Sequence, residues 1–166
     1  MSIPQSGGGL IEHHDQLAQL LADGCKPKDT WRIGTEHEKF GYFKDSHLPL
    51  PYEGACSVKA MLEGLRDGFG WSPVLEAGNI IGLEKNGANV SLEPGGQLEL
   101  SGAPLENIHE TCDEVNEHLK EVRQVADRIG AGYIGLGASP DWTHEQVPMM
   151  PKGRYRLMTD YMDRVG

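Results

Sequence analysis

The sequence predicts an α+β fold, in which short strands pair through tight turns and separate helices pack against them. Residues 90–101 alternate apolar and polar side chains on both sides of Pro94-Gly95-Gly96, which is the pattern of a β-hairpin. The clearest helix follows at 108–129, where apolar residues recur at steps of three and four and Gly130 is placed to end it. The length of 166 residues and the 38% hydrophobic content suit one domain with a real core.

The first half of the chain predicts two helices and a strand. Residues 10–22 have leucines on one helical side, with Gly24 just past the end. Residues 31–42 read as a strand. Ser57 is a suitable N-cap for a helix whose apolar positions share one face, namely Val58, Met61, Leu62 and Leu65.

Three further strands and one helix complete the predicted elements. Residues 71–75 and 80–85 are candidate strands on either side of a turn at 77–79. Residues 133–138 form a glycine-loosened strand, and a helix is expected to begin near Arg154. We expect residues 1–9 to be a flexible lead-in and residues 10–166 to be part of a longer polypeptide.

Composition and charge exclude several classes of partner and of scaffold. The net charge of −10 leaves no basic stripe, which argues against a nucleic-acid partner but permits ATP, because divalent metals can supply positive charge. No signal peptide and no membrane-length apolar run are evident, so the expected location is cytoplasmic, without a membrane partner. Cys25, Cys56 and Cys112 are too scattered for a disulfide scaffold. The first two fall in predicted loops, and Cys112 falls on the apolar stripe of the long helix, where we expect it to be part of the core.

Two short acidic segments are the main candidates for a site. Glu36 and Glu38 point to one side of their strand, and Gln97, Glu99 and Ser101 form a second polar row, because side chains two apart on a strand share a face. If both strands lie in one sheet, the carboxylates converge, and like charges held close need cations. Hard oxygen ligands without thiolates favour magnesium together with a nucleotide.

Plainer interpretations of these segments stay open. Glu36 and Glu38 could be solvated charges of an edge strand, with Arg32 paired to Glu36. The segment with Glu93 and Glu99 could be a purely structural hairpin, since Pro-Gly turns are common.

A basic segment at 151–156 places three cations around a glycine at a predicted helix start, as an anion clamp would. A surface basic cluster explains the same spacing equally well. The short glycine run at 135–138 lacks the G-x-G-x-x-G context of a dinucleotide-binding motif and the Lys-Ser/Thr pair of a P-loop. We therefore exclude both motifs at this position.

Taken together, these segments resemble the glutamate–cysteine ligases of the plant and proteobacterial type. The resemblance runs from about residue 10 to the end and keeps the motifs in order. The matching stretches are residues 32–41 (RIGTEHEKFG), 80–84 (IIGLE), 91–104 (SLEPGGQLELSGAP) and 151–155 (PKGRY). Family members are considerably longer, so the resemblance also implies that residues 10–166 are the N-terminal part of the catalytic domain of such a ligase.

The resemblance implies a carboxylate–amine ligase with a glutamine-synthetase-like fold, a curved and mainly antiparallel sheet with flanking helices that is incomplete in this chain. It implies ATP-dependent joining of the γ-carboxylate of L-glutamate to the amine of L-cysteine through a γ-glutamyl phosphate, the first step of glutathione synthesis. The implied partners are these small molecules, Mg²⁺ and the remainder of the catalytic domain, without which the fragment is expected to be inactive.

The resemblance also implies roles for particular residues. Glu36, Glu38, Glu93 and Glu99 would be the magnesium ligands. Gln97 would orient substrate, and Arg154, with Lys152, would meet a phosphate or the glutamate carboxylate. Two alternatives stay open: a glutamate ligase with another amine acceptor, and a non-catalytic module that binds metal or carboxylate.

Overall fold

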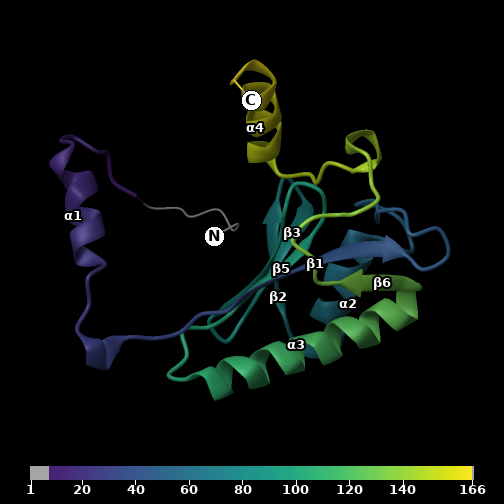
Figure 1. Ribbon diagram of the computed structural model, residues 1–166, viewed down its shortest axis with the longest axis horizontal. Coiled ribbons are helices and arrows are strands. Elements are labelled where there is room, and N and C mark those ends of the chain that lie inside the picture. The colour runs from purple at the N-terminus through teal and green to yellow at the C-terminus, as the bar shows by residue number, and fades with distance from the viewer. Residues whose placement is uncertain (1–7, 166) are drawn as a thin grey trace.

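The computed structural model describes residues 8–165 and contains one six-stranded sheet with the strand order β2-β3-β4-β5-β1-β6. Every pairing in it is antiparallel. The strands are β1 (Glu36–Phe43), β2 (Ser72–Glu76), β3 (Asn79–Lys85), β4 (Ala88–Leu92), β5 (Leu98–Ser101) and β6 (Ala131–Ile134). This arrangement confirms the predicted α+β class and its antiparallel sheet (Figure 1).

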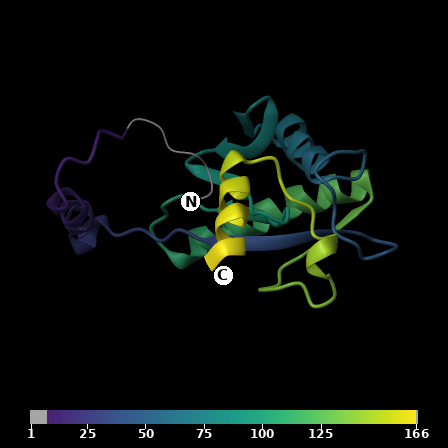
Figure 2. The ribbon, with the colours of Figure 1, turned by 90° about the horizontal axis from the view of Figure 1, so that it is seen from above.

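The helices fall into two groups by position. They are α1 (Asp15–Asp23), α2 (Val58–Phe69), α3 (Ile108–Ile129) and α4 (Gly153–Val165), with short 3₁₀ turns at Lys28–Thr30 and His144–Gln146. Helices α2 and α3 pack against each other and against one face of the sheet. Helix α4 stands beyond the strands on the other side, and α1 lies away from the sheet in both views (Figures 1 and 2).

The core fills the space between the sheet and the α2–α3 pair. Leucine and valine side chains on alternate positions of β4 and β5 point toward the helices, with Val90 opposite Leu100 in the strand register. Helix α2 begins where Ser57 was expected to cap it, since the Ser57 hydroxyl accepts from the Ala60 amide at 3.1 Å. Its apolar face lies against this core, with Leu62 and Leu65 fully buried.

The opposite face of the sheet carries the acidic segments. Glu38 of β1 lies opposite Glu99 of β5, and Glu99 lies opposite Ser91 of β4. Strand β1 pairs with β5 along Glu36–Lys39 and with β6 only along Phe40–Phe43, so the stretch that carries Glu36 and Glu38 has a partner strand on one side only and the edge-strand interpretation stays open. The two acidic segments therefore share one sheet and one face, as predicted.

Several predicted boundaries are wrong by a few residues. The strand expected from residue 31 begins at Glu36, and before it Ile33 makes only an isolated bridge with Leu105. The strand expected at 133–138 occupies 131–134, because its pairing with β1 ends at Phe40 opposite Ile134. The strand expected at 71–75 runs one residue later, at 72–76.

Two predictions about burial are also wrong. The first helix begins at Asp15 rather than residue 10, and none of its residues is buried. Cys112 is exposed rather than in the core, because α3 turns other residues toward the sheet, among them His118, Val122 and Ala126. The predicted flexible lead-in at 1–9 lies mostly outside the described residues. Within residues 8–165 no helix is long and apolar enough to cross a membrane.

Candidate active site

Glu99 is the most buried carboxylate of the acidic face. Its side chain is 9% exposed and lies between two hydroxyls, since Ser91 donates to Oε2 at 3.0 Å and Ser101 donates to Oε1 at 3.3 Å. Both serines share the face of Glu99 through the strand register and the period of two. These donors hold the carboxylate in one orientation and stabilise its charged form.

Three carboxylates of this face interact electrostatically. The pKa of Glu38 is raised, first by burial and then by the negative charges of Glu93 and Glu99. Negative charges that face Glu38 in this way favour a bound cation. Glu36 lies two residues earlier on β1, opposite Ser101, and is exposed.

The tight turn between β4 and β5 positions Glu93 and Gln97. The Glu93 amide donates to the Gln97 carbonyl at 3.0 Å, and the Gly96 amide donates to the Glu93 carbonyl at 2.9 Å. Gly96 has a φ of 85°, a conformation that side chains with a Cβ rarely adopt. The Gln97 Oε1 is buried and has no hydrogen-bond partner among residues 8–165.

The basic segment docks against this same turn. The Met150 amide donates to the Pro94 carbonyl at 3.0 Å, and the Gly153 amide at the start of α4 donates to Glu76 Oε1 at 2.8 Å. Lys152 is 3% exposed, and its Nζ donates to the Leu92 carbonyl at 2.8 Å. The segment is therefore not merely a surface cluster, because one of its cations is buried at the end of β4.

The charge of Lys152 is coupled to both its neighbours and the acidic face. The pKa of Lys152 is lowered to about 8, first by burial and then by Arg154, whereas Glu93, Glu99 and Glu76 act in the opposite direction. Arg154 itself is exposed at the side of Tyr155. A buried lysine and an exposed arginine thus border the carboxylates, and the arginine is accessible to an incoming anion.

The structure brings most of the predicted residues together. Glu38, Glu93, Glu99 and Lys152 interact electrostatically, whereas Glu36 lies further along the strand. Arg32 pairs with Glu106 at 3.7 Å and not with Glu36. Sequence reasoning missed Ser91, although its position two residues before Glu93 on an alternating strand places it on the same face.

The donor set has the chemistry that magnesium prefers, since carboxylate oxygens are hard ligands and their mutual repulsion favours a divalent cation. Within residues 8–165, no three acidic, histidine or cysteine side chains are already gathered closely enough to hold a metal ion. The residues fit the ion in kind and in charge, and their side chains would have to draw together to ligate it.

Lys39 lies on the helix-covered face of β1, the side opposite Glu38. It is 2% exposed, and its Nζ donates to the His37 carbonyl at 2.8 Å and lies 2.9 Å from His37 Nδ1. Burial lowers the pKa of Lys39 from 10.5 to about 8, with Glu38 and Glu99 acting in the opposite direction. The folded chain therefore buries the charged ammonium group of Lys39 at neutral pH.

This burial predicts a pH dependence of stability. Between about pH 8 and 10.5 the unfolded chain binds a proton at Lys39 that the folded chain has lost, so the folded state gains stability as pH rises. We expect the free energy of unfolding of the wild type, minus that of Lys39→Met, to increase from about pH 8 to about pH 10 in urea titrations. Lys120→Met, at an exposed position of α3, is the matched control. A difference independent of pH would contradict the expectation.

The observed fold and site define an α+β protein whose open sheet face presents coupled carboxylates beside a buried lysine and an exposed arginine. Such a face suits a polyanion accompanied by divalent cations. Residues 32–166 match the glutamate-cysteine ligase family 2 (GCS2), and the chain belongs to that family. This confirms the family that the sequence motifs resemble.

Curated relatives are similar over most of this chain. The chain is 53% identical over 150 residues to a chloroplastic glutamate–cysteine ligase of Medicago truncatula, an alignment that covers 90% of this chain and 29% of the relative. Identity is 49% over 152 residues to the chloroplastic glutamate–cysteine ligase A of Oryza sativa subsp. japonica (92% and 30% covered). It is also 49% to the chloroplastic enzyme of Arabidopsis thaliana (92% and 28% covered).

Two consequences follow from these relatives. The chain spans less than a third of their length, between 28% and 30% in these three comparisons. The predicted cytoplasmic location is wrong on this comparison, because these relatives are named as chloroplastic proteins. Composition carried no information about a plastid.

Proposed function

We propose that this chain forms part of the active site of an ATP-dependent glutamate–cysteine ligase, in which L-glutamate is joined through its γ-carboxylate to the amine of L-cysteine. One observation carries the proposal. In a member of the ligase family, Glu38, Glu93 and Glu99 interact with one another on the open sheet face, and Lys152 is buried beside them.

The proposed chemistry proceeds in two steps. The γ-carboxylate oxygen of glutamate attacks the γ-phosphorus of ATP, the bond to ADP breaks, and γ-glutamyl phosphate forms. The cysteine amine then attacks the acyl carbon, loses a proton, and inorganic phosphate leaves. Phosphoryl transfer requires mainly positioning and charge stabilisation from the protein, because little covalent chemistry falls to side chains.

The residues of this chain have distinct proposed roles. Glu36, Glu38, Glu93 and Glu99 would hold Mg²⁺, which would supply positive charge to the phosphates. Arg154 would meet a phosphate or the glutamate carboxylate from its exposed position, and Lys152 would contribute positive charge from beneath the turn. Gln97 would orient substrate once its side-chain oxygen, buried without a partner among the described residues, accepts a hydrogen bond.

We further propose that activity belongs to the longer protein and that the fold is of the glutamine-synthetase type. Support comes from the antiparallel sheet with one open face and from the share of the relatives that this chain covers, 29% for the Medicago enzyme. The rest of the catalytic domain would cover that face and supply the cysteine site.

The decisive experiment incubates L-glutamate, L-cysteine and Mg-ATP with the full-length protein and, separately, with the 166-residue chain, and measures γ-glutamylcysteine and ADP. We expect the dipeptide and ADP in equal amounts from the full-length protein alone. Product from the short chain would overturn the requirement for the remainder. ADP formation with another amine but not with cysteine would reassign the acceptor, and magnesium binding without nucleotide turnover would indicate a non-catalytic module.

A further inference from the structure

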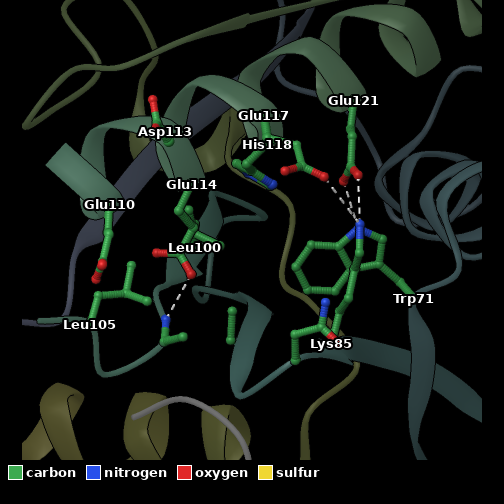
Figure 3. A pocket seen from close by; sticks show the side chains of 13 residues that line it. Trp71, Lys85, Leu100, Leu105, Glu110, Asp113, Glu114, Glu117, His118 and Glu121 are labelled. Atoms are coloured by element: carbon green, nitrogen blue, oxygen red, sulfur yellow. Dashed lines mark hydrogen bonds and ion pairs between the residues drawn. The ribbon is translucent and has the colours of Figure 1, made fainter.

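A cavity of about 280 Å³ lies on the face of the sheet that α3 covers, between α3 and the strands β3, β4 and β5. Figure 3 shows Glu110, Glu114 and Glu121 of α3 pointing toward it from one side, with Trp71 and Lys85 on the other. The cavity is separate from the proposed ligase site, because α3 covers the face opposite Glu38 and Glu99. Its size is near the lower end of small-molecule sites, roughly 300–1,000 Å³.

Two buried groups in this cavity have no hydrogen-bond partner within residues 8–165. His118 is 2% exposed, and neither of its ring nitrogens has a partner. Glu114 accepts from the Ala103 amide at 2.9 Å through Oε1, whereas its buried Oε2 has no partner. Buried polar groups are normally hydrogen-bonded, so two neighbouring exceptions lining one cavity point to a ligand that supplies donors.

The charged groups that line the cavity determine which hydrogen-bond donors a ligand should carry. The pKa of His118 is lowered to about 3, first by burial and then by Lys39, His37 and Lys85, so the ring is neutral at physiological pH and has one nitrogen free to accept. The only lysine of the cavity lining, Lys85, is already paired, with Glu121 at 2.8 Å and with Glu117 at 3.7 Å.

The remaining charges of the lining are negative. Glu110 lies on the same helix one turn before Glu114, and its side chain points to the same side, whereas the carboxylate of Asp113 points away from the cavity (Figure 3). The wall opposite is apolar, formed by Leu100, Leu105 and the ring of Trp71, which is 6% exposed. A suitable ligand is therefore cationic at more than one position and has an aliphatic middle.

We propose that this cavity binds a small aliphatic polyammonium compound of the diamine or triamine class. One terminal ammonium donates to Glu114 Oε2 and to the accepting ring nitrogen of His118. The methylene chain lies against Leu100, Leu105 and Trp71, and a second ammonium lies near Glu110. An anion is disfavoured by the carboxylates, and a bare metal ion by the lack, within the described residues, of three closely gathered ligands.

The test is calorimetric titration of spermidine into the full-length protein without substrates, so that its result is independent of ligase activity. We expect saturable binding of one spermidine per chain. Glu114→Gln retains an oxygen for the Ala103 amide but removes the charge, and it should weaken binding about tenfold or more. Asp127→Asn removes one carboxylate from the same helix outside the cavity and should leave the affinity unchanged. Matching unfolding curves would show that the variants are folded.

A second measurement reports on His118 itself. In histidine-labelled protein, spermidine should shift the ¹⁵N resonances assigned to the His118 ring, and Glu114→Gln should reduce that shift at equal spermidine concentration. Absence of saturable binding up to millimolar spermidine would overturn the proposal. So would equal weakening by Asp127→Asn and Glu114→Gln, which indicates diffuse attraction to an acidic surface, or a His118 resonance that does not move.

Discussion

Glu99→Gln is expected to lower kcat for γ-glutamylcysteine formation by the full-length protein about 10²–10³-fold, the loss typical when one electrostatic group of a preorganised site is removed. The substitution keeps the shape of the side chain, and its one remaining oxygen can accept from Ser91 or Ser101, whereas its NH2 group can only donate to the other hydroxyl. It removes the negative charge that faces Glu38 and Glu93. A stopped or coupled assay that follows ADP at saturating glutamate, cysteine and ATP measures the effect.

The matched control for this prediction is Glu84→Gln. Glu84 lies on the same face of the sheet but at an exposed position of β3, in line with Asn89 and not with Glu99. It should change kcat by less than about threefold, since its charge is screened by solvent. Near-normal turnover of Glu99→Gln would remove Glu99 from the proposed metal set, and an equal loss in Glu84→Gln would make the effect one of overall charge.

Leu65→Ala is expected to lower the free energy of unfolding of the chain by about 2–5 kcal/mol, because it deletes buried methyl groups and leaves a cavity. Leu65 is fully buried on α2, in the cluster between the sheet and the two packed helices. It lies on the side of the sheet away from Glu99. The loss of stability should therefore appear in urea unfolding curves of the chain, while the full-length protein with the same substitution keeps its normal kcat when folded.

Leu20→Ala provides the comparison for this core substitution. Leu20 lies on α1 and is 71% exposed, so its truncation should change the free energy of unfolding by less than about 0.5 kcal/mol. Similar losses of unfolding free energy for both substitutions would mean that α1 packs against the rest of the chain in solution. A negligible loss for Leu65→Ala would contradict the assignment of α2 to the core.

The fold was largely predictable because its signals are local. Ser57 caps α2, Gly130 ends α3, and the turn with Gly96 joins two strands whose residues alternate. The errors arose where pairing partners, rather than local pattern, decide the outcome. Residues 31–35 have strand-forming side chains but form no continuous ladder, since Ile33 makes an isolated bridge with Leu105 and the Thr35 carbonyl accepts from the Gly102 amide. Residues after Ile134 lose their partner strand.

The amphipathic pattern of a helix does not reveal which residues its neighbours leave open. Cys112 belongs to an apolar repeat, yet it is exposed, because near this end of α3 the side chains of Glu114 and His118 face the cavity instead. In the same way Leu17, Leu20 and Leu21 form an apolar side on α1 that nothing in the described residues buries. Periodicity indicates a face, and only packing shows whether it is covered.

The sequence by itself determined the antiparallel α+β class, the hairpin that carries Glu93 and Glu99, and the family, because these depend on spacing within short segments. Only the tertiary structure decided that Glu38 lies opposite Glu99 and that Lys152 is buried beside them, since strand register and the docking of a distant segment bring these charges together. It alone also placed His118 in a cavity where its ring nitrogens have no hydrogen-bond partner among residues 8–165. Burial and charge proximity are properties of the assembled fold, and they alter pKa values in ways that no linear spacing encodes.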